Sequence, residues 1–234
     1  MSTKLLKVAV NWLIRDKIEK GDLKLFGTLT RKCENVSVTL AELASIVNDG
    51  HPFCAQHRIS RKDENFICSD VLAVDIDGGM KMSDALNNDF VKQYGGFVYR
   101  TPSHTESHHR FRIVFQTERT ITDPTQMTAA YQGLIRKFGG DKTCKDACRA
   151  FYGSQGSDPI MLGNVLSNDQ LDQLIKLGHD PASVPDKSST NGKKNYPNVV
   201  RRSDVDISPD HPVTRANGVT EAFCSIPFEE SVHV

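Results

Sequence analysis

The chain has 234 residues, of which 38% are hydrophobic and 25% are charged. These fractions exclude a fibre or a wholly disordered chain, and they allow one large domain or one domain with a tail. Basic and acidic residues each total 29, so the formal net charge is zero, which excludes a globally basic nucleic-acid binder but not a local basic cleft. No apolar run reaches the roughly 18–20 residues that cross a bilayer. No signal peptide is visible, so we expect no membrane contact, a cytoplasmic location and reduced cysteines.

The N-terminal segment is ambiguous between helix and strand. Residues 4–20 fit a helical face, although Val8 and Val10 also fit strand alternation, and we favour a helix that Gly21 ends. Residues 23–30, LKLFGTLT, then predict a strand.

The next segments alternate a helix, a loop and apolar strands. Thr39 and Glu42 have capping-box spacing and predict a helix that Gly50 ends. Residues 51–66 have no clean period and predict a loop. The apolar run at 71–74 is typical of a buried central strand.

Two more strands and a helix follow. Residues 83–94 predict a helix, and the segments GFVYRT and RFRIVF predict strands at 96–101 and 110–115. The polar sequence SHTESHH between these strands predicts a loop or hairpin.

The last periodic elements are two helices and a short strand. Asp123 and Pro124 form an N-cap and first-turn pair, which predicts a helix that ends at the glycines after Phe138. Residues 149–153 predict a short strand, and residues 167–178 predict a final helix.

The composition changes from Asp180 onward. Six of the ten prolines lie in the final 55 residues, among Ser, Asn, Lys and Asp, without a sustained period. We therefore expect a folded domain over residues 1–178 and a flexible tail or linker over residues 179–234.

Asp75 and Asp77 end the predicted central strand at positions i and i+2. Because side chains alternate along a strand, both carboxylates leave the same face. Two adjacent carboxylates repel, and a divalent cation such as Mg²⁺ relieves that cost. The alternative is a solvated strand end with a turn-forming aspartate.

Basic residues cluster in and after the polar loop. His104, His108 and His109 are three of the eight histidines, and Arg110 and Arg112 alternate along the next strand. Histidine and arginine can both donate to phosphate, so the cluster predicts a triphosphate contact, with an exposed polar hairpin as the alternative.

A third acidic position follows the double glycine. Asp141 could supply another carboxylate, and Arg149 lies eight residues on, although Asp146 competes for the same role. The six cysteines include no CxxC pair and give no zinc signature, and Cys33, Cys54 and Cys68 are scattered along the chain.

Together, the segments VDID, YRTPSHTESHHRFRIVF and GGDKTCKDACRAFYG resemble the catalytic domain of the archaeo-eukaryotic primase (AEP) superfamily. The resemblance covers roughly Leu23 to Ser167 and is strongest to primase-polymerase domains of plasmid and phage replication proteins. It implies an α+β protein of AEP-type primase fold, with an RRM-like antiparallel sheet and an accessory α/β unit.

The resemblance also implies template-directed nucleotidyl transfer from NTP or dNTP substrates on single-stranded DNA. The residues that it assigns to Mg²⁺ or Mn²⁺ and to catalysis are Asp75, Asp77 and Asp141. The residues that it assigns to the triphosphate are His104 or His109, Arg110, Arg112 and Arg149. A helicase domain or protein is a further partner implied by the family.

The template would be held by a separate basic cluster. Arg58, Arg61 and Lys62 precede the metal-binding strand and could follow a phosphate backbone, with a solvated surface loop as the alternative.

Two other functions compete with nucleotidyl transfer. A rolling-circle replication endonuclease would need a tyrosine nucleophile, for which Tyr131 is the candidate. A catalytically inactive nucleic-acid-binding or nucleotide-binding domain of a larger replication protein would keep the site without turnover.

Overall fold

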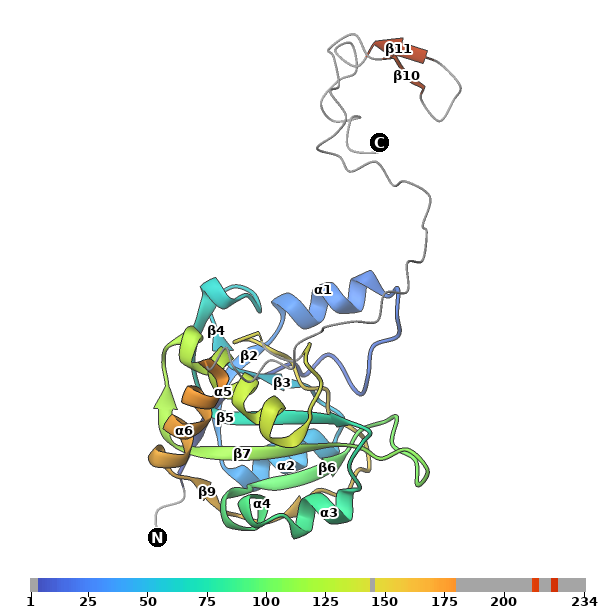
Figure 1. Cartoon of the computed structure of the whole chain (residues 1–234). Helices are drawn as coiled ribbons and strands as arrows, with labels where there is room; N and C mark the ends of the chain where they lie inside the picture. Colours follow the sequence, from blue (N-terminus) through green and yellow to red (C-terminus); the bar gives the residue numbers. More distant parts are fainter. Residues whose placement is uncertain (1–3, 144–145, 180–211, 215–219, 223–234) are drawn as a thin grey trace, which may run out of the picture. The chain divides into compact units, whose positions relative to one another are not determined.

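The computed structural model describes residues 4–143, 146–179, 212–214 and 220–222. The chain divides into two compact units, residues 1–185 and residues 186–234 (Figure 1). In the second unit the described residues are two short antiparallel strands, β10 (Pro212–Thr214) and β11 (Thr220–Ala222). Most of the predicted tail lies outside the described residues, and the division at residue 178 stays a prediction.

The first unit combines helices with mainly antiparallel strands, so the α+β class is confirmed. Its elements up to the longest strand are β1 (Leu6–Val10), α1 (Leu23–Arg31), β2 (Glu34–Val38), α2 (Leu40–Asn48), β3 (Phe53–Cys54), β4 (Gln56–His57), the 3₁₀ turn η1 (Asp63–Asn65) and β5 (Phe66–Asp77). The elements after it are α3 (Met82–Asn87), α4 (Asp89–Tyr94), β6 (Phe97–Arg100), β7 (Arg110–Ile121), α5 (Pro124–Phe138), β8 (Ile160–Met161), β9 (Val165–Leu166) and α6 (Asn168–His179).

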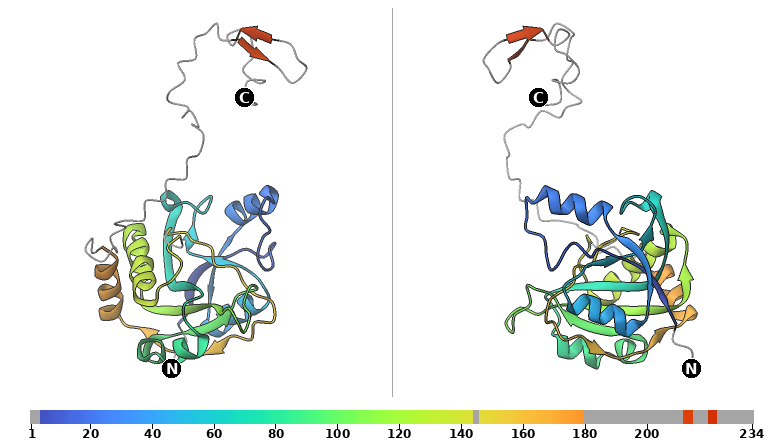
Figure 2. Two further views of the ribbon diagram at one scale, coloured as in Figure 1. Left: turned by 45° about the vertical axis from the view of Figure 1, so that its right-hand side comes forward. Right: turned by 180° about the vertical axis from the view of Figure 1, so that it is seen from behind.

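The larger sheet has the strand order β4-β5-β7-β6-β8, with β9 pairing parallel to β7. The long strands β5 and β7 form its centre, and the residues from Val71 to Val74 on β5 are all buried, as the apolar run predicts. Helices α5 and α6 pack on one face of this sheet and α2 lies on the other (Figures 1 and 2). The centre of the sheet is therefore covered on both faces.

Two glycines allow α5 and α6 to pack closely. A Cβ on Gly133 would lie 2.1 Å from the carbonyl oxygen of Leu174, and a Cβ on Gly178 would lie 1.9 Å from that of Ala129. Any larger residue at either position would push the helices apart. The helix pair therefore depends on these two positions to reach its packing distance.

Two predictions at the N-terminus are wrong, and one of them concerns β1, the central strand of the smaller sheet β2-β1-β3. Residues 4–20 contain the strand β1 rather than a helix, because Leu6, Val8 and Val10 are all buried and the alternation outweighs the helical period. Residues 23–30 form the helix α1 rather than a strand. The Asp22 side chain accepts from the Leu25 backbone N–H and caps it.

The capped helices are confirmed. The Glu42 backbone N–H donates to the Thr39 hydroxyl at 3.2 Å and the Thr39 N–H donates to the Glu42 carboxylate at 2.7 Å, so the capping box opens α2. Asp123 caps α5, and Gly139 ends it in the left-handed conformation.

Three other predictions need adjustment. The predicted helix 83–94 is two short helices, because Asn88 ends α3 and caps α4. The predicted strand 149–153 is reduced to a single bridge between Phe151 and Phe53. The predicted loop 51–66 contains the short strands β3 and β4.

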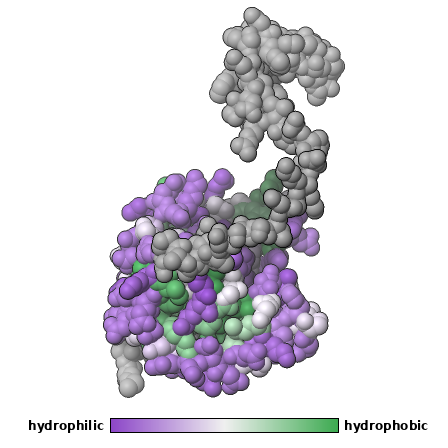
Figure 3. All heavy atoms as spheres, in the orientation of Figure 1, coloured by the Kyte–Doolittle hydropathy of each residue, from purple (hydrophilic) through white to green (hydrophobic). Residues whose placement is uncertain are grey.

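Hydrophilic residues cover most of the face of the first unit seen in Figure 3. Among the described residues, no helix has the length and apolar character needed to cross a bilayer.

Candidate active site

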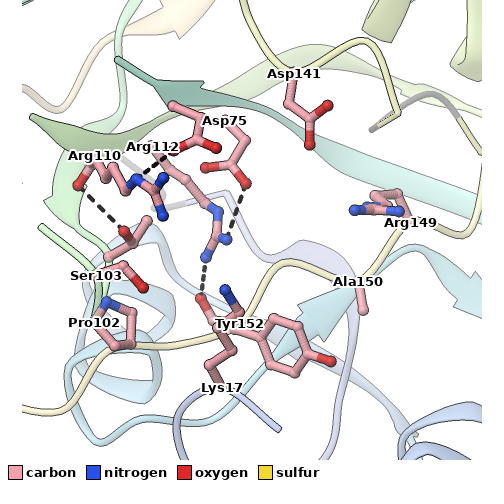
Figure 4. A pocket seen from close by; sticks show the side chains of 12 residues that line it. Lys17, Asp75, Pro102, Ser103, Arg110, Arg112, Asp141, Arg149, Ala150 and Tyr152 are labelled. Carbon is pink, nitrogen blue, oxygen red and sulfur yellow. Dashed lines mark hydrogen bonds and ion pairs between the residues drawn. The ribbon is translucent and has the colours of Figure 1, made fainter. Parts of the chain in front are cut away.

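A pocket of about 170 Å³ opens where the paired strands β5 and β7 end. Loop segments at residues 17, 101–103, 141 and 149–152 approach it (Figure 4). The lining residues are Lys17, Asp75, Asp77, Thr101, Pro102, Ser103, Arg110, Arg112, Asp141, Arg149, Ala150 and Tyr152. The three predicted carboxylates and the three arginines predicted to contact the triphosphate are therefore in one pocket.

The antiparallel register of β5 and β7 pairs each aspartate with an arginine. Asp75 lies opposite Arg112, and Asp77 lies opposite Arg110. Arg112 Nη2 is 3.1 Å from Asp75 Oδ2, and Arg110 Nε is 2.5 Å from Asp77 Oδ1. The Asp75 side chain is 19% exposed and the Asp77 side chain is 51% exposed. The Asp75–Arg112 pair is therefore largely buried, and the Asp77–Arg110 pair is more accessible to solvent.

Asp141 is held beside β5 by its own backbone. Its N–H donates to the carbonyl oxygen of Asp75 at 2.9 Å. This approach requires glycine at position 140, because a Cβ there would lie 2.6 Å from Val74 Cγ2 and 3.0 Å from the Asp75 carbonyl oxygen. The left-handed Gly139 makes the turn out of α5. The double glycine thus delivers a third carboxylate to the strand end (Figure 4).

Arg112 is the most buried charge of the site. Its side chain is 9% exposed, and Nη1 donates to the Tyr99 hydroxyl at 3.1 Å and to the Tyr152 carbonyl oxygen at 2.5 Å. Burial acts to lower the pKa of Arg112, but Tyr99 and Asp75 outweigh it and the pKa is raised. The guanidinium therefore stays charged and fixes the inner carboxylate.

Two further cations border the pocket. Arg149 Nη1 lies 3.8 Å from Asp146, and its Nε is buried with no hydrogen-bond partner among the described residues. Lys17 is an exposed residue of the loop between β1 and α1. The lining therefore carries four basic side chains against three carboxylates, which suits an anionic ligand bound together with cations.

The two histidines assigned to the triphosphate lie outside the pocket lining. His104 Nδ1 accepts from the Arg110 N–H at 3.1 Å, and His109 Nδ1 accepts from the Met82 N–H at 3.4 Å. Their rings contact each other edge to face at a centroid distance of 5.1 Å. In this conformation both histidines hold the β6–β7 loop. His108 comes nearer to the carboxylates, with Nε2 3.9 Å from Asp77 Oδ1.

The basic cluster assigned to the template also lies outside the pocket. Arg61 donates to the carbonyl oxygens of Leu29 at 3.2 Å and Cys148 at 3.0 Å, so it ties its loop to α1. Arg58 and Lys62 are exposed, and Lys62 forms an ion pair with Glu64 at 3.4 Å. Arg58 and Lys62 thus remain accessible for a backbone contact.

Lys17, Tyr99 and Tyr152 were not predicted as site residues. Lys17 lies in the segment that was assigned to a helix, and Tyr152 contributes its backbone carbonyl, for which a sequence carries no signal. Tyr99 lies in the predicted strand GFVYRT, shortly before the basic loop. Its hydroxyl, a polar group in a buried strand, was the signal that could have marked it as a site residue.

No family model matches the sequence, and no curated protein matches it. Matching solved structures include the AEP domain of the cyanophage S-2L primase-polymerase, at 13% identity and a TM-score of 0.41, over 74% of this chain and 89% of that chain. The catalytic domain of primase Repb' in complex with initiator DNA matches at 11% identity and a TM-score of 0.33, over 74% of this chain and 87% of that chain. Both of these structures are of primase domains.

Proposed function

We propose that this protein is a DNA-directed nucleotidyltransferase of the primase-polymerase type, acting on a single-stranded DNA template with NTP or dNTP substrates. The observation that carries the proposal is the convergence of Asp75, Asp77 and Asp141 at one strand end, within a ring of basic side chains. Nucleotidyl transfer needs this combination, because carboxylates hold the cations and basic groups neutralise the triphosphate.

The carboxylates fit Mg²⁺ or Mn²⁺ by their chemistry. The three candidate ligands are hard oxygen donors, and the exposed Asp77 leaves room for water and phosphate oxygens in the remaining positions. A cation bound at this strand end would lower the pKa of the attacking 3′-hydroxyl and offset charge on the triphosphate.

The basic residues divide into two roles. Arg112 is buried and bonded to Asp75, Tyr99 and Tyr152, so it is a positioning residue for the inner carboxylate. Arg149, Arg110 and Lys17 border the open part of the pocket and would face the phosphates of a nucleotide. Arginine can offer two parallel donors to a phosphate, which favours orientation as well as charge neutralisation.

The test is nucleotide incorporation on a single-stranded template, with and without a primer, in Mg²⁺ or Mn²⁺. Asp75→Asn/Asp77→Asn should abolish the product. A matched control is Asp169→Asn/Asp172→Asn, which removes two carboxylates from α6 outside the pocket and should leave the product unchanged. Metal-independent product, or product that survives the first double variant, would contradict the proposal.

The same assay separates the competing functions. A binding module would retain template or nucleotide affinity but yield no product with any cation. A rolling-circle endonuclease would form a covalent adduct through Tyr131, yet Tyr131 is 2% exposed and its ring packs 5.7 Å from that of Phe151 in the core. Its burial counts against the nuclease.

A further inference from the structure

Two cysteines and a histidine from separate elements meet near the C-terminal end of α1. Cys33 follows the helix, Cys54 ends β3 and His57 ends β4. One potential ligand atom from each residue lies within 4.8 Å of the other two. This cluster shares no residue with the pocket of carboxylates. We propose that Cys33, Cys54 and His57 form a binding site for Zn²⁺.

The separations suit a tetrahedral zinc ion. Zn–S distances of about 2.3 Å and Zn–N distances of about 2.0 Å set the ligand atoms of a tetrahedral site roughly 3.5–3.8 Å apart. One potential ligand atom of each residue here lies within 4.8 Å of the other two, close to these separations. Small rotations of the side chains are enough to close the site.

The surrounding polar groups orient the ligands. His57 Nδ1 is 3.0 Å from the carbonyl oxygen of Ala55, and a proton donated there leaves Nε2 as the ligand atom. Zinc-bound histidines usually donate their second ring nitrogen in this way. The Asn11 amide lies 3.9 Å from Cys33 Sγ and donates toward it. Cys33 Sγ lies 3.3 Å from the Leu29 carbonyl oxygen, a contact at the C-terminal end of α1.

Burial and charge also favour zinc over a hard cation. Cys54 is 3% exposed and His57 is 4% exposed, while Cys33 is half-buried and forms the open side. Two thiolates and one dication are neutral together, so the site can stay in a largely dry environment. Thiolate and imidazole ligands select zinc rather than Mg²⁺, and three protein ligands leave the fourth position for water.

The position explains what the site would do for the fold. Zinc would join the end of α1 to the β3–β4 turn, next to the loop that carries Arg58 and Arg61. The 20 residues between the cysteines conceal the site in the sequence, because Cys33 lies next to Cys54 only through the pairing of β1 with β2 and β3.

The experiment uses the full chain, reduced and stripped with a chelator under anaerobic conditions. After one equivalent of Co²⁺ is added, the absorption of thiolate-to-cobalt charge transfer should appear, and Zn²⁺ should displace it. After desalting, the wild type should retain about one Zn²⁺ per chain. The charge-transfer band separates this site from the aspartates, which bind cobalt without sulfur, so the result does not depend on the proposed function.

Variants test the ligands individually. Cys33→Ser and His57→Gln should lose most of the retained Zn²⁺, whereas Cys68→Ser and Cys148→Ser remove cysteines outside the cluster and should keep it. Circular dichroism shows whether each variant is folded. The absence of a charge-transfer band in the wild type would overturn the proposal, as would full Zn²⁺ retention in folded Cys33→Ser.

Discussion

Replacing Arg112 with alanine is expected to lower the free energy of unfolding by about 3 kcal/mol. The change removes the partner of Asp75 from a largely dry position, where the Arg112 side chain is 9% exposed. Breaking a buried ion pair by removing one member costs about 3–5 kcal/mol, because the other charge is left without compensation.

Two features of the structure place the expected cost at the lower end. Asp75 is 19% exposed, so water can solvate part of its charge after the change. The Tyr152 carbonyl oxygen still accepts from the Tyr99 hydroxyl at 2.9 Å, so it is not left without a donor. Arg112→Lys keeps the charge but not the branched guanidinium that serves three acceptors at once, and should cost about half as much.

Urea denaturation followed by circular dichroism measures these differences. The matched control is Arg119→Ala, which breaks an exposed ion pair with Asp172 and should cost about 0.2–1 kcal/mol. If Arg112→Ala costs no more than Arg119→Ala, the assignment of Arg112 as the group that holds the inner carboxylate is refuted.

Three further changes test other parts of the structure. Gly140→Ala should destabilise the protein by about 1–3 kcal/mol and impair nucleotide incorporation, because the new Cβ would collide with Val74. The control Gly27→Ala on α1 places its Cβ where no atom lies within 4 Å and should stabilise the protein by about 0.5–1 kcal/mol. Thermal melts of both variants measure these effects. Lys17→Ala should raise the KM for nucleotide without lowering the melting temperature. The control Lys20→Ala lies outside the pocket lining and should leave the KM unchanged. An equal change in KM for the two variants would contradict a role for Lys17. In chelator-treated protein, Cys33 should react with iodoacetamide well before Cys148. Hydrogen bonds, of which the one from Cys54 has the largest effect, lower the pKa of Cys33 to about 5. Burial raises the pKa of Cys148 to about 12. The labelling rate of Cys33 should therefore rise as the pH passes through about 5 and level off above it. Peptide mass spectrometry after brief labelling at pH 7 measures the two sites, and faster labelling of Cys148 than of Cys33 would contradict this prediction.

The central part of the fold could be predicted because its signals are local. The buried run before Asp75 gave a strand, the capping box at Thr39 gave a helix, and Asp123 with Pro124 gave another. At the N-terminus the apolar pattern was misleading. Leu23 is 81% exposed, so the alternating leucines of LKLFGTLT do not mark a buried strand face, and the cap at Asp22 decides for a helix.

The candidate site was predictable where chemistry follows from spacing. Alternation along β5 and β7 put Asp75 with Asp77 and Arg110 with Arg112 on shared faces, but the register that pairs them depends on the tertiary fold. Lys17 reaches the pocket through a loop without periodicity. Cys33 and Cys54 meet only because β1 pairs with both β2 and β3, which no short motif encodes.

The paired register of β5 and β7 has a consequence for how the protein folds. Each carboxylate on the strand pair meets its guanidinium as the two strands align, so the repulsion between Asp75 and Asp77 is offset within the polypeptide itself. Assembly of the sheet therefore needs no cation to offset that repulsion. The strand end that would hold the proposed cation can therefore form before any cation is bound.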